Sequence, residues 1–358
     1  MTRLPLRRSA PALALATAAV MMLAGCAAGE GSSVAPAAAP ATAGAEGWSA
    51  DTLTVDWATY NPLSLIVKDQ GLLEARLGSD VTVDWVQSAG SNKANELLRA
   101  GAVDVGSTAG SAALLARANG SPIRTIDVYS QPEWTAIVVP EGSPITSVDQ
   151  LRGADVAATK GTDPYFFLLQ TLDEAGIPAS DVTIQNLQHA DGRAALENGS
   201  VDAWAGLDPL MAASEAQAGS TLLYRNVDFA TYGFLNATQS FLDASPDLAQ
   251  AVVDAYEQAR AWAVAHPDET AAILAQAAAI DPAVASTVID RTNLGVDPVP
   301  GDAQRDVLER VGPILVDSGD VPDRGKVDAA LDELFEPRFA EAADPAAEAA
   351  DPAAGAAG

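Results

Sequence analysis

Residues 96–106 read ELLRAGAVDVG, and residues 194–204 read AALENGSVDAW. Both segments consist of a helical pattern, a glycine, a small residue and then Val-Asp at the opening of an apolar run. A glycine in this place fits the left-handed residue that ends many helices, and the apolar run is typical of a buried strand. The repeated unit predicts two similar α/β lobes, although a common helix–strand loop used twice by chance would read the same way.

Short apolar strands alternate with helical patterns on both sides of these segments, as in α/β proteins. The expected strands span residues 53–57, 81–86, 103–107, 135–139, 155–158, 182–186 and 201–205. The expected helices span residues 64–77, 92–99, 112–118, 165–175 and 192–197. From Pro246 onward the chain is expected to be mostly helical, with prolines 267, 282 and 298 at helix starts or in loops.

The N-terminus has the composition of an export signal. Residues 1–8 are basic, residues 10–23 form an apolar run too short to span a bilayer, and Leu23-Ala24-Gly25-Cys26 resembles a bacterial lipobox. We expect residues 1–25 to be a lipoprotein signal peptide. Cys26 would carry the lipid that anchors the exported protein on the outer face of the bacterial cytoplasmic membrane. The alternative is an ordinary signal peptide followed by an incidental cysteine.

Two segments flank the part of the chain that can fold. Residues 26–50 are expected to be a flexible tether, because they have almost no large apolar side chain. Residues 340–358 are expected to be a disordered Ala/Asp/Pro tail. Hydrophobic residues make up 48% of the 358 residues, which is enough for the core of two ordinary domains. The formal net charge of −28 would repel phosphate backbones, so nucleic acid is not an expected partner.

The sequence offers little for catalysis. Its two histidines, His189 and His266, have no metal-ligand cluster around them, and no P-loop or dinucleotide fingerprint is present. Residues 106–110 (GSTAG) resemble a nucleophile elbow only faintly, because the central residue is threonine. Cys26 is the only cysteine, so it has no disulfide partner within the chain. We therefore expect a binding protein without a cofactor or a bound metal, and not an enzyme.

Small polar loops follow three of the expected strands and open the next helix. They are residues 87–92, 108–111 and 160–164, which are rich in Gly, Ser and Thr. In open α/β sheets ligands bind beyond the carboxyl ends of the strands, and a helix N-terminus favours an anion. The three loops together predict a ligand cleft, although any one of them could be an ordinary helix cap.

Six segments carry a resemblance to a known family. They are residues 69–74 (DQGLLE), 101–106 (GAVDVG), 137–145 (IVVPEGSPI), 149–153 (DQLRG), 160–162 (KGT) and 199–204 (GSVDAW). From residue 53 to about residue 223 the chain resembles the substrate-binding components of aliphatic-sulfonate ABC importers. That branch also covers taurine, nitrate and thiamine-precursor binders. The helical region 246–271 fits the same pattern. The order and spacing of the segments are specific for the family but much less so for the ligand.

The resemblance implies a type II periplasmic-binding-protein fold, in which two α/β lobes joined by a two-strand hinge hold the ligand between them. Lobe 1 would comprise residues 51–131 and 234–339, and lobe 2 residues 132–233. The repeated unit would then occur once in each lobe. The protein would be the extracytoplasmic solute-binding component of an ABC importer, a monomer that delivers a small molecule to a permease in the membrane.

Carried over by position, the resemblance implies a ligand site built from both lobes. Its expected residues are Tyr60, Asn61, Ser88, Ser91, Thr108, Ser111, Gly161, Thr162, Tyr165, Asp191, Trp204 and Asp208. Trp134 is added to them because it stands at the end of an element, where a ligand can reach it. Backbone N–H groups and hydroxyl groups, such as those of Ser111 and Thr162, would hold an oxyanion. Trp134 or Tyr165 would cover the organic tail of the ligand.

The expected ligand is an aliphatic sulfonate or a related small organic anion. Asp163 departs from the family pattern, because a carboxylate there would weaken anion binding unless it turns inward. The alternatives are therefore a thiamine-precursor-like heterocycle, taurine or nitrate, with Asp163, Asp191 and Asp208 available to pair with a cationic ligand. An enzyme that reuses the fold is a further alternative.

Overall fold

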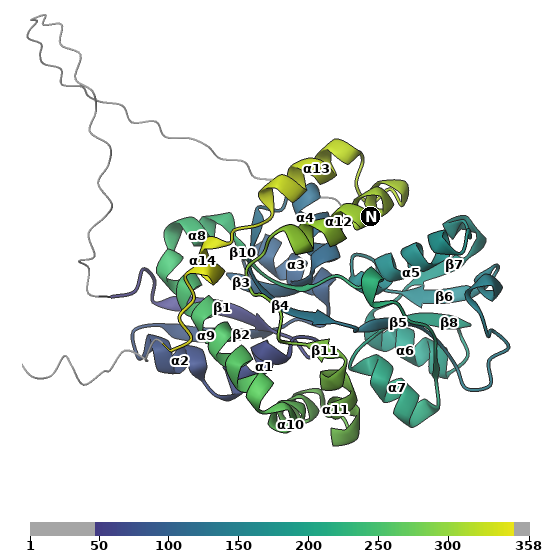
Figure 1. Cartoon of the computed structure of the whole chain (residues 1–358), viewed down its shortest axis with the longest axis horizontal. Coiled ribbons are helices and arrows are strands. Elements are labelled where there is room, and N and C mark those ends of the chain that lie inside the picture. Colours follow the sequence, from purple (N-terminus) through teal and green to yellow (C-terminus); the bar gives the residue numbers. More distant parts are fainter. Residues whose placement is uncertain (1–46, 347–358) are drawn as a thin grey trace, which may run out of the picture. The chain divides into compact units, whose positions relative to one another are not determined.

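The computed structural model describes residues 47–346 (Figure 1). The expected signal peptide, Cys26, most of the expected tether and residues 347–358 of the expected tail lie outside the described residues. Residues 47–346 contain two mixed β-sheets flanked by helices. Among residues 47–346, none of the helices combines the length and the apolar composition of a membrane span.

The first sheet has the strand order β11-β4-β10-β3-β1-β2. Its strands are β1 (Thr52–Trp57), β2 (Thr82–Gln87), β3 (Val105–Ala109), β4 (Ile123–Pro132), β10 (Gly233–Thr238) and β11 (Thr292–Asn293). Strands β1, β2 and β3 run parallel, whereas β10 is antiparallel to both β3 and β4. The carboxyl ends of β1, β2 and β3 therefore lie at one edge of this sheet.

The second sheet has the strand order β7-β6-β8-β5-β9. Its strands are β5 (Thr135–Val139), β6 (Asp155–Ala158), β7 (Thr183–Asn186), β8 (Ala203–Leu207) and β9 (Thr221–Tyr224). Strands β6, β7 and β8 run parallel, so their carboxyl ends also share one edge. The chain passes between the two sheets twice, through residues 133–134 and 225–232. The expected class, two α/β lobes joined by two crossings, is confirmed.

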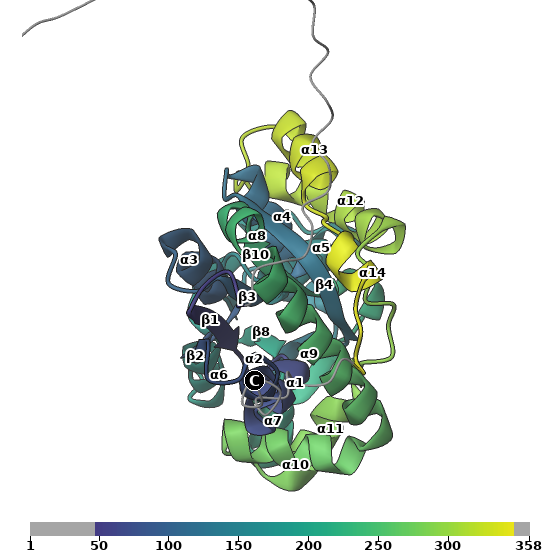
Figure 2. The same cartoon turned by 90° about the vertical axis from the view of Figure 1, so that its left-hand side faces the viewer.

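Helices cover both faces of the first sheet (Figures 1 and 2). The helices of lobe 1 are α1 (Pro62–Asp69), α2 (Leu72–Leu77), α3 (Ser91–Ala100), α4 (Gly110–Ala118), α8 (Gln239–Ala244), α9 (Pro246–Ala265), α10 (Pro267–Ala278), α11 (Pro282–Asp290), α12 (Asp302–Asp317), α13 (Arg324–Glu333) and α14 (Arg338–Glu341). One core cluster joins the sheet to α1, α2 and α9. A second core cluster lies on the other face, with α4, α12 and α13, and continues into lobe 2.

Lobe 2 carries α5 (Asp163–Glu174), α6 (His189–Glu197) and α7 (Leu210–Ala218). Short 3-10 turns span Val148–Leu151, Ala179–Asp181 and Val227–Phe229. Phe166 and Leu168 of α5 belong to the second core cluster, together with Leu308 of α12. The two lobes therefore share apolar packing on the side of α4, α5 and α12.

The repeated sequence unit is one structural unit present in each lobe. Asp104 precedes β3, and its carboxylate accepts a hydrogen bond from the N–H of Thr54 at 2.8 Å. Asp202 precedes β8, and its carboxylate accepts one from the N–H of Asp155 at 2.9 Å. Each aspartate thus ties the start of its own strand to the parallel neighbouring strand. The strands begin after these aspartates, at residues 105 and 203, and not at residues 103 and 201 as expected.

The packed part of the chain extends slightly beyond residues 51–339. The backbone N–H and the hydroxyl group of Ser49 donate to the carboxylate of Asp247, at 2.8 and 2.5 Å. At the other end Ala340 is buried, and the N–H of Asp344 donates to Asp254 at 3.0 Å. Residues 47–50 of the expected tether and 340–344 of the expected tail therefore pack against lobe 1.

Candidate functional site

The two lobes contact each other along the edges where their parallel strands end. We call this region the interlobe seam, and define it as residues 88–92 and 108–111 of lobe 1 together with residues 159–163 and 187–191 of lobe 2. Helices α3 and α4 begin on its lobe-1 side, and α5 and α6 on its lobe-2 side. The seam thus forms where the sequence predicted the loops to converge.

Asp163, the first residue of α5, joins the lobes at one end of the seam. Its buried carboxylate accepts hydrogen bonds from the Ser111 hydroxyl of lobe 1 at 2.6 Å and from the Trp134 indole N–H at 2.9 Å. Thr231, in the second crossing, donates both its hydroxyl and its backbone N–H, at 2.7 and 2.8 Å. Burial raises the pKa of Asp163, while these hydrogen bonds oppose the shift. The carboxylate therefore points into the protein. The Ser111 hydroxyl donates its proton to this carboxylate and so cannot donate it to a ligand.

A second set of contacts joins the first turns of α3 and α6. The side-chain Nδ2 of Asn92 donates to Gln188 Oε1 at 3.3 Å. His189 is 2% exposed, and burial lowers its pKa to about 4. Two buried atoms here, Asn92 Oδ1 and His189 Nε2, have no hydrogen-bond partner among the described residues. They are two of ten such side-chain atoms among the described residues, and this pair lies where the two lobes meet.

Gly161 places the first turn of α5 against the same spot. Its φ of +76° belongs to the left-handed region, which glycine enters without strain. A Cβ on Gly161 would stand 3.8 Å from both the Cβ of Asn92 and the Cδ2 of Leu115. The N-terminal turns of α3, α5 and α6 therefore meet in the seam, and Leu115 supplies an apolar side chain beside them.

Ion pairs join the lobes on the side of α7 and α11. Asp208 follows β8 and is 3% exposed, and burial raises its pKa to about 6. Arg291, directly after α11, lies 3.4 Å from Asp208 and 2.8 Å from Glu215 of α7. Since Arg291 belongs to lobe 1 and both acids belong to lobe 2, these pairs bridge the lobes.

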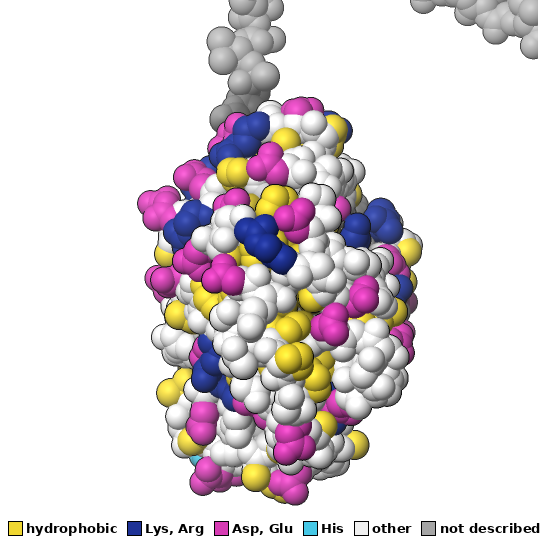
Figure 3. All heavy atoms as spheres, turned by 90° about the vertical axis from the view of Figure 1, so that its right-hand side faces the viewer, with side chains coloured by type: hydrophobic (Ala, Val, Ile, Leu, Met, Phe, Trp, Pro, Cys, Tyr) yellow, Lys and Arg dark blue, Asp and Glu magenta, His cyan; other side chains and the backbone are white. Residues whose placement is uncertain are grey.

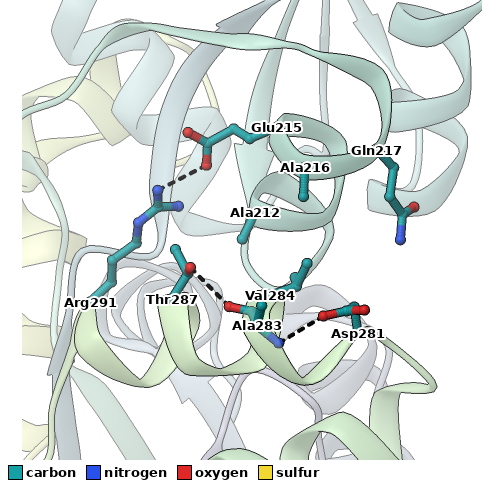
Figure 4. A pocket seen from close by; sticks show the side chains of 9 residues that line it. All are labelled: Ala212, Glu215, Ala216, Gln217, Asp281, Ala283, Val284, Thr287 and Arg291. Atoms are coloured by element: carbon teal, nitrogen blue, oxygen red, sulfur yellow. Dashed lines mark hydrogen bonds and ion pairs between the residues drawn. The ribbon is translucent and has the colours of Figure 1, made fainter.

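A cavity of about 490 Å³ lies beside these ion pairs, between α7 and α11 (Figure 4). It is lined by Ala212, Glu215, Ala216, Gln217, Asp281, Ala283, Val284, Thr287 and Arg291. None of the residues expected to bind the ligand lines it. The side chain of Asp281 accepts a hydrogen bond from the N–H of Ala283, and Arg291 is paired with Glu215, so the charged groups of the wall are already satisfied.

Several expected lobe-1 residues direct their polar atoms into their own lobe. The hydroxyl of Tyr60 donates to the Ser107 carbonyl at 2.8 Å, and Asn61 caps α1 while donating to the Ser107 hydroxyl at 2.9 Å. The hydroxyl of Ser88 donates to Asp56 at 2.7 Å. Burial raises the pKa of Asp56 to about 6. These side chains support the ends of β1 and β3 beneath the seam.

Two further lobe-1 residues also hold the loops that form the seam. Thr108 accepts a hydrogen bond from Asn236 of β10 at 2.8 Å. Ser91 accepts one from the N–H of Ala109 at 2.9 Å, which ties the start of α3 to the end of β3. Of the expected lobe-1 residues, Ser111 alone makes a hydrogen bond to lobe 2 among the described residues.

The expected lobe-2 residues divide between the seam and other places. Thr162 donates its hydroxyl to the Thr159 carbonyl at 2.6 Å and so closes its own loop. Tyr165 lines a hollow of about 590 Å³ between α5 and α12. Trp204 is fully buried in the core of lobe 2, with its indole nitrogen against α6, and Asp191 is exposed on α6.

Sequence reasoning missed Gln188, Thr231 and Arg291 as interlobe residues. It included Asn92 only as the last residue of the loop 87–92, and considered His189 only as a metal ligand. Asn92 and His189 each stand at the start of a helix after a strand, which is a signal that could have identified them. Arg291 and Asp208 are 83 positions apart in the chain, and no local pattern links them.

The described residues contain no group of three or more His, Cys, Asp or Glu side chains placed to hold a metal ion.

Figure 3 shows the face of the molecule formed by lobe 2. Lys and Arg side chains on this face stand among Asp and Glu and form no continuous basic surface. This face therefore lacks the charge pattern of a nucleic-acid-binding surface.

A family model, a relative in sequence and two solved structures resemble this chain. The NMT1/THI5-like family model matches residues 78–270. A protein of Escherichia coli (strain K12) named as an aliphatic sulfonates-binding protein is 31% identical over 238 residues, 66% of this chain and 74% of that protein. The alkanesulfonate-binding protein SsuA from Xanthomonas axonopodis pv. citri, solved bound to MOPS, has a TM-score of 0.71 at 25% identity, covering 78% of this chain and 98% of that chain. The periplasmic aliphatic sulphonate binding protein SsuA from Escherichia coli has a TM-score of 0.68 at 26% identity, covering 80% and 93%.

Proposed function

The chain belongs to the NMT1/THI5-like family, and from this premise we propose that it is an exported solute-binding protein that delivers a small organic sulfonate to an ABC importer. The sulfonate would bind in the interlobe seam. The observation that carries the proposal is the meeting of three helix N-termini from both lobes in the seam.

The seam suits an anionic head group for an electrostatic reason. Helices α3, α5 and α6 are 10, 12 and 9 residues long, and each presents its N-terminus there. The first N–H groups of a helix have no partner within the helix, and the helix dipole places partial positive charge at this end. Backbone N–H groups would therefore hold the sulfonate. The hydroxyls of Ser111 and Thr162 are less suited, because they already donate to Asp163 and to the Thr159 carbonyl.

The same structure weakens the case for a cationic heterocycle, which depended on three aspartates. Asp163 is hydrogen-bonded by Ser111, Thr231 and Trp134, and Asp208 is paired with Arg291. Asp191 lies in the first turn of α6, at the end of the seam, and it is exposed to solvent. These aspartates leave no buried free carboxylate at the seam for a cation.

We also propose that the protein is not an enzyme. His189 is the histidine in the seam, and its Nδ1 contacts Thr159 at 3.1 Å, not a serine or cysteine nucleophile. A turnover assay with sulfonates would detect a product if the fold served catalysis here.

Thermal unfolding with added ligands tests the binding function. Ethanesulfonate and longer alkanesulfonates are expected to stabilise the protein by about 2.7 kcal/mol at a ligand concentration of about 100 Kd. Nitrate, sulfate and a neutral aminopyrimidine serve as comparison ligands. No shift with any sulfonate at millimolar concentration, or a shift with the pyrimidine alone, would contradict the proposal.

Gly161 and Gly153 form a matched pair of variants for locating the site. Both glycines have positive φ, +76° and +78°, so a leucine at either position adds a similar strain of about 1–2 kcal/mol. Gly161 faces Asn92 and Leu115, whereas nothing lies within 4 Å of a Cβ on Gly153. Gly161→Leu is expected to weaken ethanesulfonate binding by at least about 10-fold, or about 1.4 kcal/mol. Gly153→Leu should leave the affinity unchanged in calorimetry, and an equal effect of both variants would place the site elsewhere.

The lipid anchor is a separate proposal that rests on residues 23–26, which lie outside the described residues. We propose that Cys26 is the first residue after cleavage and carries the lipid. Cys26→Ser is expected to release the protein from the membrane or to leave it uncleaved. An intact mass showing a cleaved wild-type protein with an unmodified Cys26 would refute the anchor.

A further inference from the structure

We propose that the hollow between α5 and α12 is a second ligand site, which binds an organic cation with an apolar body, such as a protonated aromatic amine. The hollow measures about 590 Å³, and its walls come from both lobes. None of the residues that define the seam lines it, so the two sites are separate. The inference therefore goes beyond the proposed function and does not depend on it.

Two helices turn one stripe of side chains each toward the hollow. The stripe on α5 includes Tyr165, Leu169 and Leu172, and the stripe on α12 includes Arg310, Ile314 and Asp317. Spacings of four and seven residues place side chains on one face of a helix. Both leucines are buried and Ile314 is half-buried, so these stripes give the hollow an apolar wall for the body of a ligand.

Tyr165 brings an unused hydroxyl group to this wall. The residue is only 4% exposed, and its hydroxyl makes no hydrogen bond with another described residue. Its oxygen is not one of the fully enclosed polar atoms that lack a partner, so it is reached from the hollow that Tyr165 lines. Burial, with a contribution from the charge of Asp320, raises the pKa of Tyr165 to about 12. The phenol therefore keeps its proton at neutral pH, and its oxygen can accept a hydrogen bond from a ligand.

The end of the hollow beside Tyr165 carries negative charge. Asp320 follows α12, and its influence on Tyr165 places the phenol near the C-terminal end of that helix. Asp317 is the last residue of α12, is exposed, and forms no ion pair with another described residue. The last carbonyl groups of a helix add partial negative charge. Arg310 stands seven residues before Asp317, about 10 Å along the helix axis, so it does not neutralise this end.

An ammonium group suits this end of the hollow. It would donate to the Tyr165 oxygen and to the Asp317 carboxylate, while the apolar body of the ligand covers Leu169 and Leu172. Lys160 Nζ lies 5.6 Å from the centroid of the Tyr165 ring, so a cation already approaches the ring and the ligand is expected at the hydroxyl. The protein's net charge of −28 also attracts cations at long range. The hollow and the seam therefore differ in the charge of the ligand that each one suits.

Calorimetric titration with three compounds that share a phenyl ring tests the inference. The probes are 2-phenylethylamine, which is protonated at pH 7, 2-phenylethanol, which is uncharged, and 3-phenylpropionate, which is an anion. The amine is expected to bind at least about 5-fold more tightly than the alcohol, and the carboxylate most weakly. An amine that binds no more tightly than the alcohol, or not at all at millimolar concentration, would overturn the inference.

Two conservative variants locate the bound amine. Tyr165→Phe removes the hydroxyl and keeps the ring, and Asp317→Asn removes the charge and keeps the shape. Each is expected to weaken amine binding by about 3- to 10-fold. Asp306→Asn is the matched control, because Asp306 is an exposed aspartate of the same helix that does not line the hollow, and it should keep the wild-type affinity. Unchanged amine binding in both Tyr165→Phe and Asp317→Asn would show that the cation binds elsewhere.

A titration of the amine in excess ethanesulfonate separates this site from the seam. The sulfonate should not displace the amine, and competitive displacement would place the amine in the seam and refute a second site. A protein that binds the amine as expected but binds no sulfonate would contradict the proposed function and support this inference. A protein that binds ethanesulfonate but not the amine would refute the inference alone.

Discussion

Replacing Asp163 with alanine is expected to lower the free energy of unfolding by about 3–5 kcal/mol and to separate the two lobes. The carboxylate of Asp163 accepts four hydrogen bonds, which come from Ser111, Trp134 and both donors of Thr231. Its removal leaves these buried donors without an acceptor, at about 1–3 kcal/mol for each donor that finds no new partner. Thermal unfolding measures the loss, and small-angle scattering measures the radius of gyration, which should increase.

Two further variants separate this role from a general effect of the substitution. Asp163→Asn keeps the shape and one acceptor oxygen, so its loss should be smaller than that of Asp163→Ala. Asp173 lies on the same helix but is exposed, so Asp173→Ala should change stability by no more than about 0.5 kcal/mol. An Asp163→Ala protein with wild-type stability and an unchanged scattering profile would show that this carboxylate does not hold the lobes together.

Replacing Arg291 with alanine is expected to cost about 2–4 kcal/mol at neutral pH. The substitution leaves Asp208, which is 3% exposed, without its cation in a buried place. It also removes the partner of Glu215. Arg305 provides the matched control, because it pairs with Asp332, whose side chain is 74% exposed. Arg305→Ala should cost no more than about 1 kcal/mol.

The loss on Arg291→Ala should depend on pH in a defined direction. Burial raises the pKa of Asp208 from 3.8 to about 6, so its contribution to stability is present below pH 3.8 and is lost as the pH rises through 6. Without Arg291 the charged form loses its main support, and the pKa should rise further. The difference between the variant and the wild type should therefore be largest above pH 6 and smallest near pH 4, where Asp208 is protonated in both. Urea unfolding at the two extremes measures it, and an equal loss at both would contradict the role of this ion pair.

The parts of the fold that could be predicted are those that local chemistry determines. The Gly-x-Val-Asp segments were recognisable because a left-handed glycine and a strand-tying aspartate act within a few residues of each other. The expected helix over residues 64–77 was wrong in one respect, since Gly71, with φ of +63°, divides it into α1 and α2. The glycine was visible in the sequence, but its backbone conformation was not.

Strand β4 escaped prediction because its polar residues have distant partners. Its sequence, IRTIDVYSQP, places the buried Asp127 in the middle of a largely buried strand. Arg260 of α9 donates to Asp127 and to the carbonyl oxygens of Val128 and Tyr129. These partners are more than 130 positions away in the chain, so the local pattern shows a charged segment where the structure has a central strand.

The candidate site could be predicted in part, namely where local sequence determines it. Glycines and hydroxyl residues after parallel strands identified the loops, and Ser111 and Gly161 do lie where the lobes meet. Whether a polar atom in these loops is free depends on the contact between lobes, which the sequence does not encode locally. Asn92 and Gln188 are 96 positions apart, and the unpartnered atoms beside them become visible only when both lobes are in place.

A crystal structure of the protein grown with ethanesulfonate tests the central claim most directly. The account predicts a sulfonate held by backbone N–H groups between the first turns of α3, α5 and α6, with Gly161 and Asn92 against it. A ligand bound instead in the cavity between α7 and α11, or a seam that stays empty at a concentration that saturates binding in solution, would contradict it.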